Sequence, residues 1–283
     1  MSATSLTWDG RSIPGPGGLP AVAVSLTGPS LAQARTQARS AIDAGADVLE
    51  LRVDLLEEAG ALAAPAPLDA ATAAAQVLEC LRGLGEAIDG AAPLLLTCRT
   101  AAEGGRARLD DAAYGTLLRS VLDGFTDWVP QRRPAAIDVE VQRGCLKWVC
   151  EQAHGLGIDV VASFHDFEAT PADDLLEEVL ARMACEDADL AKIAVWPTSA
   201  DDVARLLGVC ARATAGAGEG TGLGVPVAAM SMGALGAVSR VAPAFGTALT
   251  FAVVPDEQGE SRASAPGQLP IQDVRRCLEL LRV

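Results

Sequence analysis

Lysine and histidine are scarce in this 283-residue sequence. Lys147 and Lys192 are the only lysines among 22 basic residues, and only two histidines are present. So few imidazoles argue against a zinc site, and the seven scattered cysteines contain no CxxC pair that could take their place. We therefore expect no bound metal, and we expect the cysteines to be buried, reduced thiols.

Long apolar runs and excess positive charge are also missing. No apolar run reaches the roughly 18 residues of a membrane span, although half of the residues are hydrophobic. Residues 1–20 lack a basic stretch followed by an apolar one, so we interpret them as a polar, turn-rich lead-in rather than a secretory signal. The net charge of −15 disfavours nucleic acid and anionic membranes as partners. We expect a cytoplasmic protein that can still bind a small anion through local arginines.

Short runs typical of β-strands alternate with helical patterns along the whole chain. Eight alternations within roughly 250 residues predict a (β/α)8 TIM barrel, an α/β fold, formed as a single domain over residues 1–283. The strands are expected at 21–26, 47–53, 93–99, 135–141, 158–164, 189–195, 226–232 and 247–253.

Helix starts are marked by capping residues. Ser30 is expected to cap the helix that follows the first strand. Thr170 is expected to cap a later helix, with Pro171 at its first position and acidic residues in its first turn. Thr198 or Ser199 is expected to cap the next one, and residues 269–283 form a final amphipathic helix.

A doubly wound open sheet is the competing fold. Such sheets usually carry a glycine-rich phosphate loop directly after the first strand, and the stretch "SLTGPSLAQ" at 25–33 is not that loop. The glycine-rich segment 216–224 precedes a strand, so we interpret it as a flexible connection. The barrel is therefore favoured.

Polar side chains stand at the carboxyl ends of the expected strands, which in a barrel converge on one mouth. Pairs spaced by two residues face the same side of their strand. The candidates are Glu50, Arg52, Asp54, Arg99, Glu103, Asp138, Glu140, His165, Lys192, Arg240, Ser264 and Gln268.

Each candidate also has a purely structural interpretation. The Glu/Arg sets can be barrel ion pairs, with Asp138 and Glu140 neutralising Arg52, and His165 can be an ordinary hydrogen-bonding residue. Lys192 is harder to explain structurally, because it interrupts the apolar run "ADLAKIAVWP". Burying an unpaired ammonium is costly, and burial favours the neutral, nucleophilic amine. Lys147 is expected to be a solvated surface charge.

Seven segments, in this order, resemble type I 3-dehydroquinate dehydratase. They span most of the chain, and their combination is far more specific than any one of them. The segments are "ELRVDLL", "LLTCRTAAEGG", "IDVEV", "SFHDFEATP", "KIAVWPTSADDV", "MSMGALGAVSR" and "ASAPGQ".

The resemblance implies a homodimeric TIM-barrel lyase of the shikimate pathway that needs no cofactor and dehydrates 3-dehydroquinate to 3-dehydroshikimate. It implies that Lys192 forms a Schiff base with the substrate, that His165 is the general acid and base, and that Glu103 tunes His165. The remaining matches are substrate-binding positions, with Asp138 as a supporting acid and Arg240 suited to the carboxylate: Ser25, Glu50, Arg52, Arg99, Asp138, Arg240, Ser264 and Gln268.

Two other functions stay open. Another lysine-imine barrel, such as a class I aldolase, would also trap substrate covalently, and an inactive barrel could sense a metabolite.

The segment 254–268 is expected to close over the substrate, although its part "PDEQGESR" is longer and more acidic than the family pattern.

Overall fold

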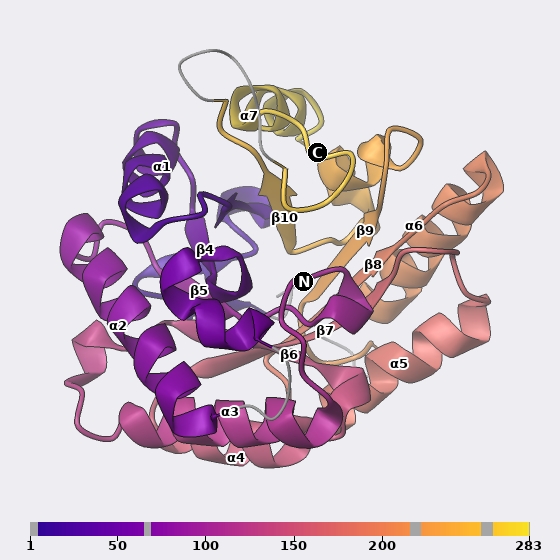
Figure 1. Cartoon of the computed structure of the whole chain (residues 1–283). Helices are drawn as coiled ribbons and strands as arrows, with labels where there is room; N and C mark the ends of the chain where they lie inside the picture. The colour runs from indigo at the N-terminus through magenta and orange to yellow at the C-terminus, as the bar shows by residue number, and fades with distance from the viewer. Residues whose placement is uncertain (1–4, 65–68, 216–221, 256–262, 283) are drawn as a thin grey trace.

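The structure is a computed structural model that describes residues 5–64, 69–215, 222–255 and 263–282. Eight parallel strands form one sheet in the order β10-β3-β4-β5-β6-β7-β8-β9. A hydrogen bond from Ala248 N to Val227 O, 2.7 Å long, brings the two ends together in a nearly closed barrel (Figure 1). The strands are β3 (Ala21–Leu26), β4 (Val48–Arg52), β5 (Leu94–Thr97), β6 (Ala136–Glu140), β7 (Asp159–Asp166), β8 (Leu190–Val195), β9 (Val227–Ser231) and β10 (Leu249–Ala252). The predicted TIM barrel and all eight strands are confirmed.

Helices cover the outside of the sheet. The described residues contain α1 (Leu31–Asp43), α2 (Ala70–Ile88), α3 (Asp111–Gly124), α4 (Leu146–Gly155), α5 (Asp173–Cys185), α6 (Ala200–Thr214) and α7 (Ile271–Leu280). The expectation of about eight helices is corrected between β9 and β10, where two 3-10 helices, η7 (Ala237–Val241) and η8 (Pro243–Phe245), stand instead of an α-helix. Other 3-10 helices are η1 (Pro16–Gly18), η2 (Val53–Leu55), η3 (Glu57–Ala63), η4 (Ala101–Glu103), η5 (Pro130–Arg132) and η6 (Val141–Arg143).

Two of the predicted helix caps are confirmed. The Ser30 hydroxyl accepts a hydrogen bond from Gln33 N at the start of α1. Ser199 and Asp202 form a capping box at the start of α6, in which each side chain accepts from the other residue's backbone N–H. These side chains satisfy N–H groups that the first helical turn leaves without partners.

The predicted cap of α5 is wrong. The helix begins at Asp173, so Pro171 lies outside it, and Ala172 at the cap position offers no side-chain hydrogen bond. The Thr170 hydroxyl instead donates to the Trp196 carbonyl oxygen at 3.0 Å, which ties the loop after β7 to the loop after β8. The acidic first turn of this helix is confirmed, with Asp173 and Asp174 near the positive helix end.

Each strand divides its residues between two cores, because successive side chains point to opposite faces. On β8, Ala191, Ile193 and Val195 pack in the outer core under the helices. Leu190 and Ala194 belong to the smaller core inside the barrel, and Lys192 stands between them on the same face. On this strand the inward Lys192 is thus flanked by apolar residues on both sides, and Ala194 lies beside it in the cavity lining.

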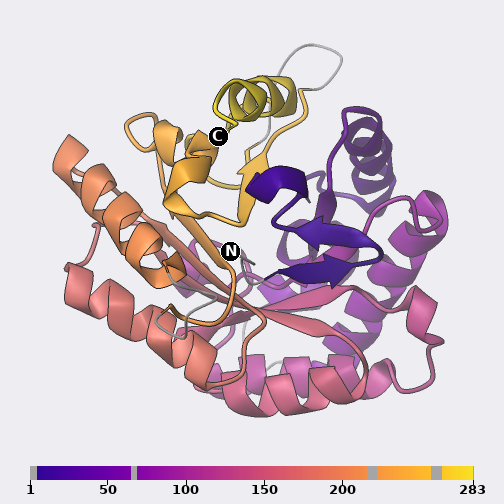
Figure 2. The ribbon, with the colours of Figure 1, turned by 180° about the vertical axis from the view of Figure 1, so that it is seen from behind.

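Residues 6–13 form an antiparallel hairpin of β1 (Leu6–Trp8) and β2 (Arg11–Ile13). The hairpin lies on the side of the barrel that faces the viewer in Figure 2. Its Trp8 and Ile13 side chains join the core inside the barrel, and Trp8 Nε1 donates to Asp159 Oδ2 at 2.8 Å where β7 begins. The interpretation of residues 1–20 as a polar lead-in is thus wrong for this part, which seals the amino end of the barrel.

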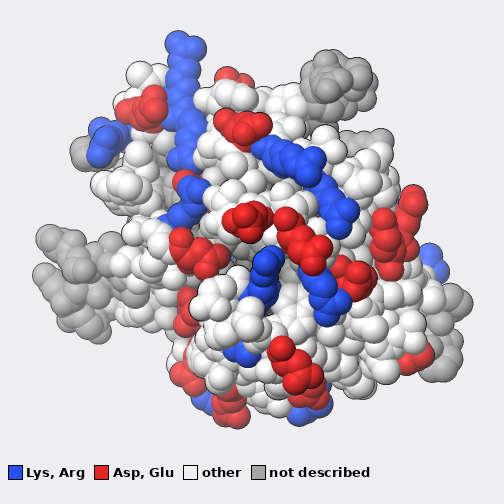
Figure 3. Space-filling view, turned by 90° about the vertical axis from the view of Figure 1, so that its left-hand side faces the viewer, with Lys and Arg blue, Asp and Glu red and all other residues white. Residues whose placement is uncertain are grey.

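The surface carries both signs of charge. On the face shown in Figure 3, acidic and basic side chains are interspersed, without a broad basic patch. Within the described ranges, no helix is both long and apolar enough to cross a membrane. All seven cysteines are free; Cys185 is exposed, Cys277 is half-buried, and the expected burial holds for Cys80, Cys98, Cys145, Cys150 and Cys210.

Candidate active site

A cavity of about 470 Å³, including its open mouth, lies at the carboxyl ends of the strands. Nine predicted site residues line it: Glu50, Arg52, Arg99, Glu103, His165, Lys192, Arg240, Ser264 and Gln268. The other two residues to which the resemblance gives a role, Ser25 and Asp138, lie behind this lining and bond to residues in it, as do the candidates Asp54 and Glu140. The strand ends therefore bring together side chains that are up to 243 positions apart in the chain.

Lys192 projects from the middle of β8 and is 5% exposed. Its Nζ lies 3.3 Å from Asp138 Oδ2 and 3.8 Å from Glu50 Oε1, and 4.5 Å from the ring centroid of Phe251. The neighbours of this amine are not only the apolar residues of its own strand, because β4 and β6 each bring a carboxylate to it. The lysine is thus buried beside groups that can balance a positive charge on its nitrogen.

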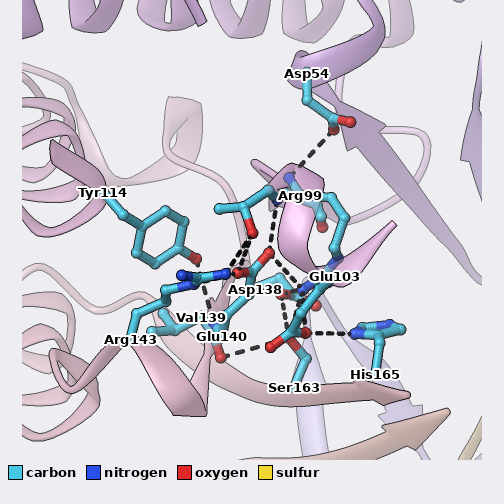
Figure 4. Close-up of polar contacts among 12 residues, drawn as sticks. Asp54, Arg99, Glu103, Tyr114, Asp138, Val139, Glu140, Arg143, Ser163 and His165 are labelled. Carbon is cyan, nitrogen blue, oxygen red and sulfur yellow. Dashed lines mark hydrogen bonds and ion pairs between the residues drawn. The ribbon is translucent and has the colours of Figure 1, made fainter. Parts of the chain in front are cut away.

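His165 lies near the carboxyl end of β7 and faces Glu103, which lies in η4. The His165 Nδ1 and Glu103 Oε2 atoms are 2.8 Å apart (Figure 4). Burial, together with the positive charges of Arg99, Lys192 and Arg52, holds the pKa of His165 well below its ordinary value. The neutral form of the imidazole is therefore favoured, and among the described residues its Nε2 has no hydrogen-bond partner.

The Glu103 carboxyl is perturbed in the opposite sense. Burial raises its pKa to about 8; Arg99 opposes this rise, while Glu140 and Asp138 add to it. Its Oε1 is buried without a hydrogen-bond partner in the described structure. Glu103 and His165 consequently form a buried pair in which charge on either member is disfavoured, and the titration of one member depends on that of the other.

Arg99 organises the acids behind the cavity (Figure 4). Its Nη2 donates to Asp138 at 2.7 Å, and its Nη1 donates to Ser163 at 2.9 Å, to Glu140 at 3.2 Å and to Glu103 at 3.4 Å. Burial alone would lower the pKa of Arg99, but these three carboxylates raise it above its ordinary value. Arg99 touches the cavity, yet these hydrogen bonds go to protein groups.

Arg52 has a different partner from the one expected. It forms a two-pronged pair with Asp54, at 2.8 and 2.7 Å, so the idea that Asp138 and Glu140 neutralise Arg52 is wrong. Asp54 also accepts hydrogen bonds from the backbone N–H groups of Arg99 and Arg106. The pair thereby fixes the path of the chain after β5.

Arg240, in η7, is 1% exposed and has no carboxylate partner among the described residues. Its guanidinium donates only to the carbonyl oxygens of Phe251 at 3.4 Å and Pro266 at 3.0 Å, and Nε has no partner in the described structure. Burial lowers the pKa of Arg240 to about 10. A buried cation without a counter-charge is costly, so the site is prepared for an anion.

Residues 263–268 approach the cavity from the loop after β10. Ser264 Oγ donates to Ser25 Oγ at 2.8 Å, and Gln268 Nε2 donates to Ser264 Oγ at 3.0 Å. Gly267 has φ +80°, and a Cβ there would lie 2.2 Å from the Gly233 carbonyl oxygen, so only glycine permits this approach. The acidic stretch "PDEQGESR", apart from Pro255, lies outside the described residues, and so does most of the glycine-rich segment 216–224.

Sequence reasoning missed the apolar and small lining residues. Their signal was available, since Ala194, Met230 and Phe251 occupy inward positions of their strands and Phe167 stands in the quoted histidine motif. These residues are Gly104, Phe167, Ala194, Met230, Phe251 and Ala265. They supply the low-dielectric walls that strengthen electrostatic interactions inside the cavity.

Gly104→Ala is expected to lower the free energy of unfolding by about 1–3 kcal/mol. Gly104 has φ +80°, and a Cβ on it would meet the Phe167 ring at 2.4 Å. This ring is 37% exposed and stacks beside His165, with centroids 6.4 Å apart. Urea unfolding of the single variant and of Gly104→Ala/Phe167→Ala measures the clash: the double variant should recover the steric part of the loss. If the effects of the two substitutions simply add, the ring does not oppose a side chain there.

Comparison with known proteins agrees with the geometry. A family model described as type I 3-dehydroquinase matches residues 22–283. The 3-dehydroquinate dehydratase of Klebsiella pneumoniae is 35% identical over 264 residues, covering 92% of each chain. That of Lactiplantibacillus plantarum is 36% identical over 268 residues, covering 93% of each chain.

Solved structures agree as well. A crystal structure of type I 3-dehydroquinate dehydratase from Clostridium difficile aligns with a TM-score of 0.80 and 28% identity, covering 99% of both chains. That of 3-dehydroquinate dehydratase from Geobacillus kaustophilus aligns with a TM-score of 0.79 and 28% identity, covering 98% of this chain and 96% of that one. With a family match over nearly its whole length and relatives above 30% identity, this chain belongs to the type I 3-dehydroquinase family.

Proposed function

We propose that this chain is a lyase that dehydrates 3-dehydroquinate to 3-dehydroshikimate through a Schiff base on Lys192, as a step of the shikimate pathway of aromatic amino acid biosynthesis. One observation carries the proposal: a buried amine lies in the cavity with a largely buried imidazole and with an arginine that has no carboxylate partner among the described residues. The other lysine, Lys147, is exposed and pairs with Asp187 at the surface. Only Lys192 can therefore meet a substrate held in the cavity.

The first step joins amine and ketone. Lys192 Nζ adds to the C3 carbonyl of the substrate, the carbonyl oxygen leaves as water, and a protonated imine remains. This imine is a better electron sink than the ketone, so it acidifies the neighbouring C2–H. The carboxylates of Asp138 and Glu50, at 3.3 and 3.8 Å from Nζ, stabilise the positive charge of the imine.

The second step is elimination. His165 Nε2 takes a proton from C2, and the electron pair moves into the imine to give an enamine. The electrons then return, the C1–O bond breaks, and the hydroxyl leaves as water with the proton from His165. Hydrolysis of the product imine consumes one water and frees Lys192, so the cycle releases one water overall.

Substrate orientation is assigned to the remaining lining residues. Arg240 is the group for the substrate carboxylate, since a guanidinium can bind it with two parallel hydrogen bonds. The hydroxyls of the substrate are assigned to the polar groups of Glu50, Arg52, Arg99, Ser264 and Gln268, with Ser25 and Asp138 behind them.

No cofactor enters the proposed steps. A cytoplasmic homodimer completes the proposal on the strength of the family resemblance, and light scattering would test the dimer against the 29.0 kDa chain.

Arg240→Met is expected to lower kcat/KM by about 10- to 100-fold, mainly through KM, because a charge-assisted pair with the substrate carboxylate is lost. The same change should leave the substrate-free protein at least as stable in thermal unfolding, since it removes a buried cation without a counter-charge. Steady-state kinetics and the melting temperature are the two measurements. A variant that melts earlier and keeps its KM would show that Arg240 supports the fold instead.

The direct test is incubation of the purified chain with 3-dehydroquinate, following the conjugated product by ultraviolet absorbance and identifying it by mass spectrometry. Loss of one water without carbon–carbon cleavage is the expected result. Cleavage products would favour a class I aldolase. Binding without any conversion would favour an inactive metabolite-sensing barrel.

A further inference from the structure

A second buried carboxylate, Glu140, stands behind the turn that carries Glu103 (Figure 4). Glu140 ends β6, is fully buried and does not line the cavity. Its Oε1 accepts from Thr100 N at 2.7 Å and from Arg99 Nη1 at 3.2 Å. Its Oε2 accepts from Thr100 Oγ1 at 2.7 Å and from Arg143 Nε at 2.9 Å. Both oxygens are thus committed to neighbouring protein groups.

Arg143 joins three elements around this carboxylate. Besides Glu140, its Nη2 donates to Thr100 Oγ1 at 2.9 Å, and its Nη1 donates to Asp111 Oδ1 at 2.7 Å at the start of α3. The Arg143 side chain is 13% exposed, whereas that of Asp111 is 65% exposed. One guanidinium therefore links the end of β6, the loop after β5 and the helix that follows this loop.

Thr100 is the base of the turn that presents Glu103. Its carbonyl oxygen accepts from Glu103 N at 3.1 Å and from Gly105 N at 2.8 Å. The turn closes tightly, since a Cβ on Gly105 would lie 2.1 Å from the Arg99 carbonyl oxygen. A clamp on both the N–H and the hydroxyl of Thr100 hence sets where the Glu103 carboxyl lies.

The charges of this cluster also depend on Arg143. Asp138, Glu140 and Glu103 all contact Arg99, a single cation. Arg143 donates to the second oxygen of Glu140. Arg99 therefore does not have to neutralise Glu140 alone, and it keeps its hydrogen bonds to Asp138 and Glu103. Removing Arg143 would leave these buried acids with less positive charge nearby.

We propose that Arg143 is a positioning residue of the proposed dehydration: by clamping Glu140 and Thr100, it holds Glu103 against His165 and balances the charge that sets how this pair titrates. This inference rests on the proposed function for its kinetic effect. Its geometric and electrostatic content concerns the Glu103–His165 pair alone and can be measured without substrate.

The sign of the expected shift follows from the charges that face Glu103. These charged or titratable groups are Arg99 from the loop after β5, His165 from β7, Asp138 and Glu140 from β6, and Arg143 from η6. His165 itself also faces Lys192 from β8 and Arg52 from β4. Removing a cation makes protonation of the pair easier, whereas removing an anion makes it harder. Arg143→Met should therefore move the titration of the pair to higher pH, and Glu140→Gln should move it to lower pH.

The experiment uses protein labelled with ¹⁵N-histidine, since the chain holds only two histidines. His165 reports the pair, and His154, bound to Asp189 2.8 Å away on other elements, serves as the internal reference. In Arg143→Met we expect the His165 titration midpoint to rise by roughly half a pH unit, with His154 unchanged. Arg143→Lys, which keeps the charge, should restore most of the midpoint.

Kinetics provide the second readout. For Arg143→Met we expect kcat to fall about 10-fold with little change in KM. The pH at which kcat rises should shift to a higher value. Arg212→Met is the matched control, because Arg212 also pairs with two acids, Glu177 and Asp173, and none of the three lines the cavity. An unmoved His165 midpoint in a folded Arg143→Met protein, or equal shifts in both arginine variants, would overturn the inference. A wild-type chain that fails to convert 3-dehydroquinate would instead reject the proposed function and leave the NMR test standing.

Discussion

Lys192→Ala is expected to abolish dehydration of 3-dehydroquinate, lowering kcat by at least about 10³-fold. Without the amine, the C2 proton must be removed next to a free ketone, and the imine that would accept the electrons is never formed. Methionine at this position is a useful companion variant, because it retains the volume of the side chain between Asp138 and the Phe251 ring.

The covalent part of this prediction is read by mass spectrometry after borohydride reduction in the presence of 3-dehydroquinate. The wild-type chain should carry one substrate-derived adduct, and peptide mapping should place it on Lys192. The natural control is Lys147→Ala, since Lys147 is exposed and does not line the cavity; it should keep both the adduct and the activity. Finding the adduct on Lys147, or full turnover with none, would reject the mechanism.

His165→Ala is expected to lower kcat by about 10²- to 10⁴-fold, the usual contribution of a positioned general base. The imine should still form in this variant, because the amine and its neighbouring carboxylates are untouched. Borohydride trapping should therefore give an adduct on Lys192 while little product appears. Rapid turnover by His165→Ala would assign the proton transfers to another group, for which Glu103 is the nearest carboxyl, 2.8 Å away.

Much of the fold could be predicted because its pattern is local. Each strand is a short apolar run, and each inward polar residue is set by a period of two along its own strand. The order of the strands along the chain is enough to put Lys192 and His165 on neighbouring strands of the barrel. Helix caps were predictable where a side chain could reach its own first turn, as at Ser30 and Ser199.

The failures involve partners that are distant in sequence. No residue close to Lys192 in the sequence indicates that the carboxylates of Asp138 and Glu50 reach it from β6 and β4. Thr170 has the composition of a cap, but its hydroxyl is better satisfied by the carbonyl of Trp196 in another loop. The hairpin at residues 6–13 is short, and its outer side chains are polar. Its inner side chains are buried only because they fit the amino end of a barrel built from residues further along the chain.

The hairpin of β1 and β2 also determines where the chain can be truncated at its amino end. Trp8 and Ile13 are among the residues that keep water from the floor of the barrel, where Leu190 lies two positions below Lys192. A shortened protein that begins at the first barrel strand would let solvent enter from underneath. Water would then reach the cavity from the side opposite to its mouth. Any truncated version of the chain should therefore retain these residues.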